Sequence, residues 1–253
     1  MLVRRLYSTA FWVFLLVSSL LLFLVAMLVW AVTAPFDRRR VVLHQFTCFW
    51  ASLYTWVNPL WSVGIEGRER IDRAETYVIV ANHLSLLDIL VLFRLFRHFK
   101  WVSKEENFTI PFIGWNMRLN GYIPLRRGDR ASVVRMMADC ERTLDGGSSI
   151  MMFPEGTRSR TGQLGRFKPG SFELALRTAR PVLPIAIEGT HTALPKRGFL
   201  LRGRHAIRVH VLDAIPPEQF AGSSAAELAE RARQRIAHRL SADAAPLPDD
   251  EAA

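Results

Sequence analysis

The stretch that decides the fold spans residues 77–96 and reads YVIVANHLSLLDILVLFRLF. Residues 77–81 are apolar and rich in β-branched side chains, which is typical of a buried strand. Residues 88–96 have the apolar character of a short buried helix. The turn between them carries Asn82 and His83. Because α/β proteins place their sites where strands end, this order predicts a functional site at the turn.

Strands and helices go on alternating through the rest of the chain. Pro124 cannot donate a hydrogen bond to a neighbouring strand, so its own strand belongs at an edge of the sheet. Ser224 and Glu227 form a capping box that starts the last helix. The alternation predicts an α/β fold with a mixed sheet flanked by helices. The other strands are expected at residues 99–103, 121–125, 150–153, 182–187 and 206–212, and the other helices at 130–145, 171–178 and 224–240.

An uncharged, strongly apolar segment at residues 10–34 precedes this domain. It is longer than the roughly 20 residues needed to cross a bilayer. It is also longer than the apolar core of a signal peptide, which has about 7–15 residues. Arginines flank both of its ends, at residues 4–5 and 38–40. We therefore expect a retained transmembrane helix.

A second uncharged segment, residues 41–63, is interrupted by polar residues and by Pro59. Its three tryptophans suit the headgroup region of a membrane. Three interpretations stay open for it: an interfacial helix, a second span that closes a hairpin, and a core helix of the globular domain. The expected organisation is a membrane anchor at 1–63, a globular domain at 64–240 and a disordered acidic tail at 241–253.

The net charge of +10 is unevenly distributed. Residues 1–65 carry five Arg and one Asp, and the last 13 residues carry four acids, so residues 66–240 hold a net +10. A basic domain favours anionic partners, either nucleic acid or an anionic membrane and its phosphorylated substrates. The membrane helix favours the second and argues against nucleic acid. Cys48 and Cys140 lie in unrelated contexts and indicate neither a disulfide framework nor a metal site.

His83 and Asp88 could form a catalytic pair. If the helix begins near Ser85, Asp88 lies in its first turn and its side chain leans back toward the turn that holds His83. A carboxylate beside an imidazole fixes the tautomer and stabilises the imidazolium formed on proton abstraction. Ser85 and Asp88 also match a helix-capping pattern, which would give Asp88 a structural role. The two roles are compatible.

A second polar cluster, residues 153–159, reads FPEGTRS and ends another strand. Gly156 permits a tight turn, Thr157 supplies a hydroxyl, and Arg158 supplies a planar donor group suited to phosphate. Glu155 could hold that guanidinium in place. The alternative is a basic, solvated turn.

A third group runs from Gly121 to Arg127, with a second arginine at Arg126. Such a pair is commonly surface charge, and it becomes a candidate phosphate ligand only if the fold brings it beside His83. The sequence has no nucleophile-elbow serine and no phosphate-binding glycine loop. A His–Asp pair without its own nucleophile suggests that the nucleophile belongs to the substrate, such as an alcohol attacking an activated acyl group.

These segments resemble the 1-acyl-sn-glycerol-3-phosphate acyltransferases and related glycerolipid acyltransferases. The resemblance covers roughly residues 64–217 and rests on four blocks in the family's order. The blocks are Asn82-His83 with Asp88, Gly121 with Arg127, the complete run from Phe153 to Ser159, and the aliphatic strand 182–187 with its central Pro184. The sequence departs from the family at Arg126, where many relatives have Asp, and this leaves the acceptor headgroup open.

The resemblance implies a glycerolipid acyltransferase fold and a mechanism. His83, held by Asp88, takes the proton of the glycerol hydroxyl of lysophosphatidic acid, whose oxygen attacks the thioester of acyl-CoA or acyl-carrier protein to give phosphatidic acid. The acceptor is bound by Asn82, Gly121, Arg127, Glu155, Gly156, Thr157, Arg158 and Pro184. No metal or prosthetic group is required.

Other functions stay open at this point. The acceptor could be glycerol 3-phosphate, another lysophospholipid or a lyso-aminolipid. A non-catalytic membrane lipid-binding protein and a hydrolase are the alternatives of a different class. The basic, aliphatic stretch 196–202 is a candidate membrane-contacting loop or an ordinary exposed one. Because Arg far outnumbers Lys, we expect a bacterial inner membrane, with the domain on the cytoplasmic side.

Overall fold

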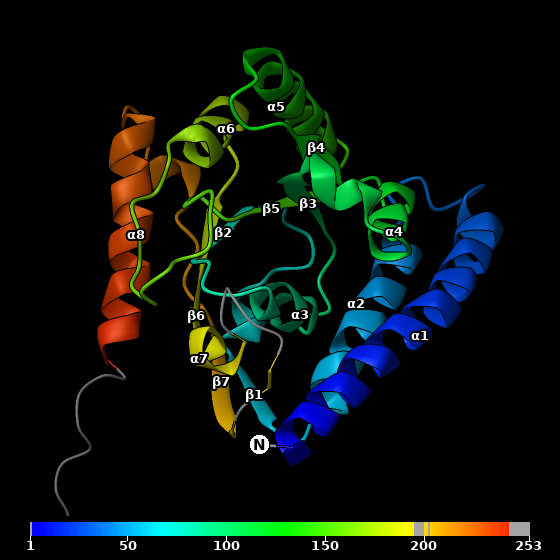
Figure 1. Ribbon diagram of the computed structural model, residues 1–253. Coiled ribbons are helices and arrows are strands. Elements are labelled where there is room, and N and C mark those ends of the chain that lie inside the picture. Colours follow the sequence, from blue (N-terminus) through cyan, green and yellow to red (C-terminus); the bar gives the residue numbers. More distant parts are fainter. Residues whose placement is uncertain (1, 195–199, 202, 243–253) are drawn as a thin grey trace, which may run out of the picture.

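The computed structural model describes residues 2–194, 200–201 and 203–242, and its centre is a seven-stranded sheet (Figure 1). Short apolar runs form the strands, as expected for a sheet covered on both faces. The strands are β1 (Trp61–Glu66), β2 (Val78–Ala81), β3 (Phe99–Lys104), β4 (Ile123–Leu125), β5 (Ser149–Met152), β6 (Val182–Glu188) and β7 (His205–Val211).

Eight α-helices accompany the strands in the described part of the chain. They are α1 (Leu2–Thr33), α2 (Val41–Trp56), α3 (Leu87–Phe93), α4 (Ile113–Leu119), α5 (Arg130–Asp145), α6 (Gly170–Thr178), α7 (Thr190–Ala193) and α8 (Ala225–Ala242). Short 3-10 turns lie at Arg68–Arg70, Glu105–Thr109 and Pro217–Gln219.

The sheet is mixed, in the order β1-β7-β6-β2-β5-β3-β4. Only the β6–β7 pair is antiparallel among these strands, so β2, β3, β4, β5 and β6 all point the same way. Their carboxyl ends therefore meet at one edge, which we call the carboxyl edge, and their starts form the amino edge. Pro124 lies in the edge strand β4, as its missing N–H requires. The predicted fold class, a mixed α/β sheet flanked by helices, is confirmed.

Two hydrophobic cores lie on opposite faces of the sheet. One face is covered by α1, α2, α3 and α4, and the other by α5, α6 and α8 (Figure 1). Leu87, Phe99 and Leu183 are among the fully buried residues of the first core, and Phe172 and Leu174 are among those of the second. The two-sided packing explains why β2, β5 and β6 consist of almost continuous apolar residues.

Three elements of the structure, β1, α4 and α7, are not predicted by the sequence pattern. Strand β1 pairs in parallel with β7 from Trp61 onward, so the domain boundary expected between residues 63 and 64 falls inside a strand of the sheet.

The N-terminal helix is the main apolar surface of the molecule. Within the described residues, the helical segment from Arg4 to Thr33 is long and apolar enough to cross a membrane. Many of its large apolar side chains are exposed, while Phe11, Phe23 and Ala26 are buried in the first core. Helix α1 thus packs along one side and leaves the rest of its apolar surface uncovered.

Helix α2 packs between α1 and α3 (Figure 1). Leu43, His44 and Cys48 on this helix are fully buried, and the Tyr54 hydroxyl lies 2.9 Å from Ser19 Oγ of α1. Of the three interpretations of residues 41–63, the core helix is the one that fits this burial. Residues 196–199 and 202, most of the candidate membrane-contacting loop, and 243–253, most of the expected acidic tail, lie outside the described residues.

Candidate active site

His83 and Asp88 form a hydrogen-bonded pair at the carboxyl edge. His83 lies two residues after the end of β2, and Asp88 lies in the first turn of α3. The distance from His83 Nδ1 to Asp88 Oδ2 is 2.8 Å. Asp88 is fully buried, whereas the His83 side chain is 13% exposed. A carboxylate on Nδ1 makes that nitrogen the donor and leaves Nε2 as the basic nitrogen, which can take a proton from a ligand.

Asp88 also accepts hydrogen bonds from the backbone of the same turn. The amides of Leu84 and Ser85 donate to Oδ2 over 2.6 and 2.8 Å. The capping role and the pairing with His83 therefore coexist on one carboxylate oxygen. Helix α3 begins at Leu87 rather than Ser85, because the 84–85 amides are bound by Asp88 and the Leu87 amide is bound by Ser85 Oγ.

Glu155 connects the second sequence cluster to the catalytic turn. Its Oε1 accepts from the His83 backbone amide over 2.7 Å, and its Oε2 accepts from the Gly165 amide over 3.0 Å. Both of these contacts are with backbone amides, and the expected contact of Glu155 with the Arg158 guanidinium stays a prediction. Burial raises the pKa of Glu155, and the two amide hydrogen bonds oppose that rise.

Phe153 supports the imidazole from its face. The rings of His83 and Phe153 are stacked, with their centroids 3.9 Å apart and their planes within 8° of parallel. The Ser159 amide donates to the His83 carbonyl over 2.8 Å. His83 is thus held at its ring nitrogen, its ring face and its backbone, the last two by residues 153–159.

A basic cavity opens beside this loop, with a volume of about 590 Å³. Gly156 has a φ of +70°, and the position that a Cβ would take there lies 2.9 Å from Lys168 Nζ. The loop needs glycine there because only glycine adopts such a φ without strain. The cavity is lined by Glu155, Thr157, Arg158, Ser159, Arg160, Thr161, Gln163, Leu164, Gly165 and Arg166. The arginines of this lining suit an anionic ligand. Glu155, which also lines the cavity, accepts the His83 backbone amide and so connects the cavity to the catalytic turn.

Arg127 lies at the carboxyl edge, just beyond the end of β4, and is exposed. Strands β5 and β3 separate β4 from β2, so Arg127 is about three strand spacings, or roughly 14 Å, along the sheet from the strand that leads to His83. The neighbouring Arg126 forms an ion pair with Glu105 over 2.7 Å.

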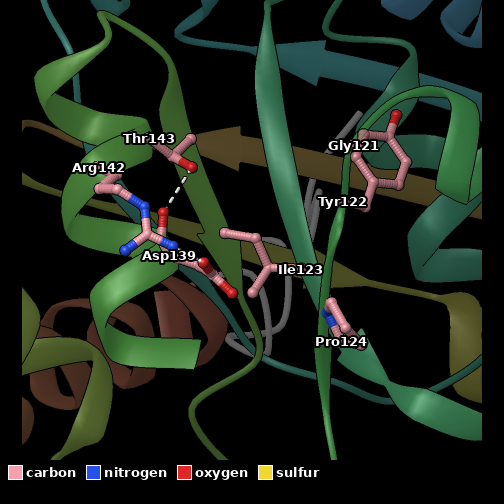
Figure 2. Close-up of a pocket in the computed structure, with 7 residues that line it drawn as sticks. All are labelled: Gly121, Tyr122, Ile123, Pro124, Asp139, Arg142 and Thr143. Carbon is pink, nitrogen blue, oxygen red and sulfur yellow. Dashed lines mark hydrogen bonds and ion pairs between the residues drawn. The ribbon is translucent and has the colours of Figure 1, made fainter. Parts of the chain in front are cut away.

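Gly121 lies away from His83. It precedes β4 and therefore belongs to the amino edge, about 13 Å along the strand from Leu125. It borders a cavity of about 290 Å³ between β4 and α5, where Arg142 is paired with Asp139 (Figure 2). Because a strand separates Gly121 from Arg127, the two halves of this block lie at opposite edges. Gly121, with a φ of +65°, turns the chain beside Arg40.

Asn82 and Pro184 have structural positions. Asn82 is fully buried, and its side-chain amide exchanges two hydrogen bonds with the backbone of Ile187, at 2.8 and 2.9 Å. Pro184 is buried in β6 opposite Val80. The Asn82 bonds tie the end of β2 to β6 and so fix the strand end from which His83 projects.

The sequence analysis missed one residue of this site. Thr190, at the start of α7, is fully buried and donates from Oγ1 to Asp88 Oδ1. The available signal was its place two residues after β6, at the same edge as His83. Among the described residues, no three His, Cys, Asp or Glu side chains are grouped to hold a metal ion.

The comparison with protein families identifies the class of protein that carries this His–Asp pair. Residues 62–188 match the family model described as acyltransferase. The chain belongs to this acyltransferase family.

Named relatives make the comparison more specific. The chain is 39% identical over 233 residues to a 1-acyl-sn-glycerol-3-phosphate acyltransferase of Chlamydomonas reinhardtii, covering 90% of this chain and 67% of that protein. It is 38% identical over 209 residues to a chloroplastic protein of the same name from Arabidopsis thaliana, covering 81% of this chain and 56% of the relative. It is 30% identical over 217 residues to the Pseudomonas aeruginosa protein of the same name, covering 84% of this chain and 82% of that protein.

A solved structure shares the fold. The crystal structure of the 1-acyl-sn-glycerophosphate acyltransferase PlsC from Thermotoga maritima superposes with a TM-score of 0.69 at 24% identity, over 93% of this chain and 100% of that one.

Proposed function

We propose that the protein transfers a fatty acyl group from acyl-CoA or acyl-carrier protein to the free hydroxyl of lysophosphatidic acid, giving phosphatidic acid. The observation that carries the proposal is the His83 ring, whose Nδ1 is held 2.8 Å from the buried Asp88 carboxylate. The names of the relatives supply the acceptor.

The reaction needs one proton to be removed and returned. Nε2 of His83 takes the proton of the glycerol hydroxyl as its oxygen attacks the thioester carbonyl. Asp88 stabilises the imidazolium. The tetrahedral intermediate then expels the thiolate, which takes the proton from His83, so that an ester and a free thiol leave and the enzyme returns unchanged. General-base catalysis of this kind contributes about 10²–10⁴-fold.

The acceptor phosphate belongs in the basic cavity beside the pair. Arg158 lines that cavity, and a guanidinium binds a phosphate through two parallel hydrogen bonds. Arg127 extends the positive charge along the same edge. Glu155 acts on His83 rather than on the substrate in this scheme, since it accepts the His83 amide.

Helix α1 gives the enzyme access to its substrates. Its exposed apolar surface and its length suit a membrane anchor, and both the acceptor and the acyl chain partition into lipid. We place the protein in a bacterial inner membrane with the domain on the cytoplasmic side, where acyl donors are made. The basic domain then faces an anionic lipid surface, which attracts it by about 1 kcal/mol for each basic residue near the surface.

Another acceptor is the second candidate. Arg126 stands where many relatives have Asp, and its guanidinium is held by Glu105 on the 3-10 turn. A changed charge next to Arg127 favours a different headgroup, as in glycerol 3-phosphate, another lysophospholipid or a lyso-aminolipid.

The test is acyl transfer by membranes that contain the full chain, with each acceptor offered acyl-CoA and acyl-carrier protein in turn. We expect acylation of lysophosphatidic acid, with thiol release that requires the acceptor. Preference for another acceptor would correct the substrate. Thiol release without an acceptor would indicate a hydrolase, and the absence of any reaction would favour a lipid-binding protein.

A further inference from the structure

The second oxygen of the Asp88 carboxylate has its own partner from a distant part of the chain. Oδ2 accepts from His83 Nδ1 and from two amides of the turn, whereas Oδ1 accepts from Thr190 Oγ1. Asp88 and Thr190 are both fully buried. The hydrogen bond therefore lies away from water, where a lost partner is not replaced.

Thr190 holds the carboxylate from outside its own element. The three donors to Oδ2 belong to residues 83–85 of the same turn and move with it. The terminal torsion of an Asp side chain is soft, so an oxygen bound only by its own turn could still rotate relative to the imidazole. A hydroxyl fixed to β6 removes that freedom.

The fold fixes Thr190 itself. Gly189, with a φ of +78°, turns the chain out of β6, and a Cβ there would collide with the Ala206 carbonyl oxygen. At the other end of α7 the Ser85 hydroxyl donates to the Leu194 carbonyl over 2.6 Å. Helix α7 is thus attached to the catalytic turn at both of its ends.

We propose that Thr190 is a positioning residue of this enzyme, which orients Asp88 and through it the His83 imidazole. The inference rests on the proposed function, because it concerns the same proton transfer. Thr190 acts through Asp88 and touches no substrate. Its hydroxyl sets the fraction of molecules in which Nε2 points at the acceptor hydroxyl.

The test compares Thr190→Val with Thr190→Ser in membrane-bound full chain. Valine keeps the shape and removes the hydroxyl, so kcat should fall about 10- to 100-fold while the KM for the acceptor stays within about twofold. Serine keeps the hydroxyl and should restore kcat to within a few-fold of wild type. In the His83→Ala background, Thr190→Val should change the residual rate by less than about twofold, because the group it orients is gone.

Thr47→Val is the matched control for lost stability. Thr47 is also a buried threonine, and its hydroxyl accepts from Asn116 and Asn120 in the α2–α4 contact, away from His83. The Thr47→Val variant should lower the melting temperature as much as Thr190→Val does, and it should leave kcat unchanged. The inference would be overturned if Thr190→Val kept the wild-type kcat, or if Thr190→Ser lost as much kcat as Thr190→Val. It would also be overturned if Thr190→Val changed only the KM for the acceptor. None of these results would contradict the proposed function, which fails if the wild type does not transfer an acyl group to lysophosphatidic acid.

Discussion

The two edges of the sheet are both rich in cations, yet they use them differently. At the amino edge, Arg39 donates to the Gly147 carbonyl, Arg40 to the Arg118 and Leu119 carbonyls, and Lys100 to the Arg39 and Asn120 carbonyls. These bonds fasten the α1–α2 connection to the domain. At the carboxyl edge, arginines line a cavity of about 590 Å³, and its wall includes Glu155, whose carboxylate accepts the His83 backbone amide.

The difference shows which charges serve binding. A cation that is bound to backbone carbonyls has a structural role, whereas cations around a cavity can meet an anion. Conversely, the carboxylates at the carboxyl edge, Asp88 and Glu155, accept from His83 and from backbone amides. In the proposed reaction, the arginines that line the cavity bind the acceptor phosphate.

The largest expected effect is on Asp88 at the carboxyl edge. In Asp88→Asn the amide can no longer accept from His83 Nδ1 and from both turn amides as a carboxylate does, so the imidazole loses its tautomer and its orientation. We expect kcat to fall roughly 10³-fold, measured as acyl transfer at saturating acceptor. A loss below about tenfold would show that Asp88 only caps α3.

The catalytic pair could be predicted from the sequence because its members are local. His83 and Asp88 are five residues apart, and a strand followed by a helix places them at one edge. Gly121 and Arg127 are also close in sequence, and proximity alone suggests that both lie at the site. Strand β4 runs between them, so they lie at opposite edges of the sheet. Thr190 is 102 residues from Asp88 along the chain, so only the parallel pairing of β2 with β6 brings them together.

Features that depend on tertiary contacts, and not on a local sequence pattern, could not be predicted either. Residues 61–63, the first half of β1, fall in the expected anchor because they continue the preceding uncharged segment, and the pairing of β1 with β7 is a tertiary contact. Sequence proximity suggests only the contact of Glu155 with Arg158, and it cannot show that the Glu155 carboxylate also accepts the amide of His83, which is 72 residues away.

Substitutions of Arg158 and Arg39 compare the roles of the basic side chains at the two edges directly. Arg158→Met removes a donor group from the basic cavity and should raise the acceptor KM about 10- to 100-fold, because charge-assisted hydrogen bonds to the phosphate are lost. Arg39→Met should leave that KM unchanged and lower the free energy of unfolding by about 1 kcal/mol, since it loses one bond to Gly147. Equal effects of the two variants on KM would contradict the division between the edges.

Glu155→Gln tests the link between the loop and the catalytic turn. The amide oxygen can accept one backbone N–H, but its NH₂ group opposes the N–H of Gly165 or of His83. We expect kcat to fall about tenfold, a smaller effect than at Asp88, with the acceptor KM within about twofold of wild type. A change confined to KM would instead place Glu155 in substrate binding.

The smallest expected effect on activity is at Lys100, where the consequence is pH-dependent stability. Burial, assisted by Arg40, lowers the pKa of Lys100 from 10.5 to about 7. Between about pH 7 and pH 10 the unfolded chain then holds a proton that the folded protein has released, so the free energy of unfolding rises with pH. Lys100→Met should flatten this rise without changing the KM for the acceptor. The free energy of unfolding of the two proteins is measured at about pH 7, 8 and 9. The same rise with pH in both proteins would refute the lowered pKa of Lys100.

Acyl transfer by His83→Ala tests the central claim most directly. Membranes containing the wild type or His83→Ala, at matched expression, are supplied with lysophosphatidic acid and acyl-CoA, and phosphatidic acid is measured over time. A general base at His83 predicts a fall of at least about a hundredfold in the variant, with the melting temperature close to that of the wild type. Equal rates of phosphatidic acid formation would show that a group other than His83 takes the proton, and the general-base mechanism would be wrong.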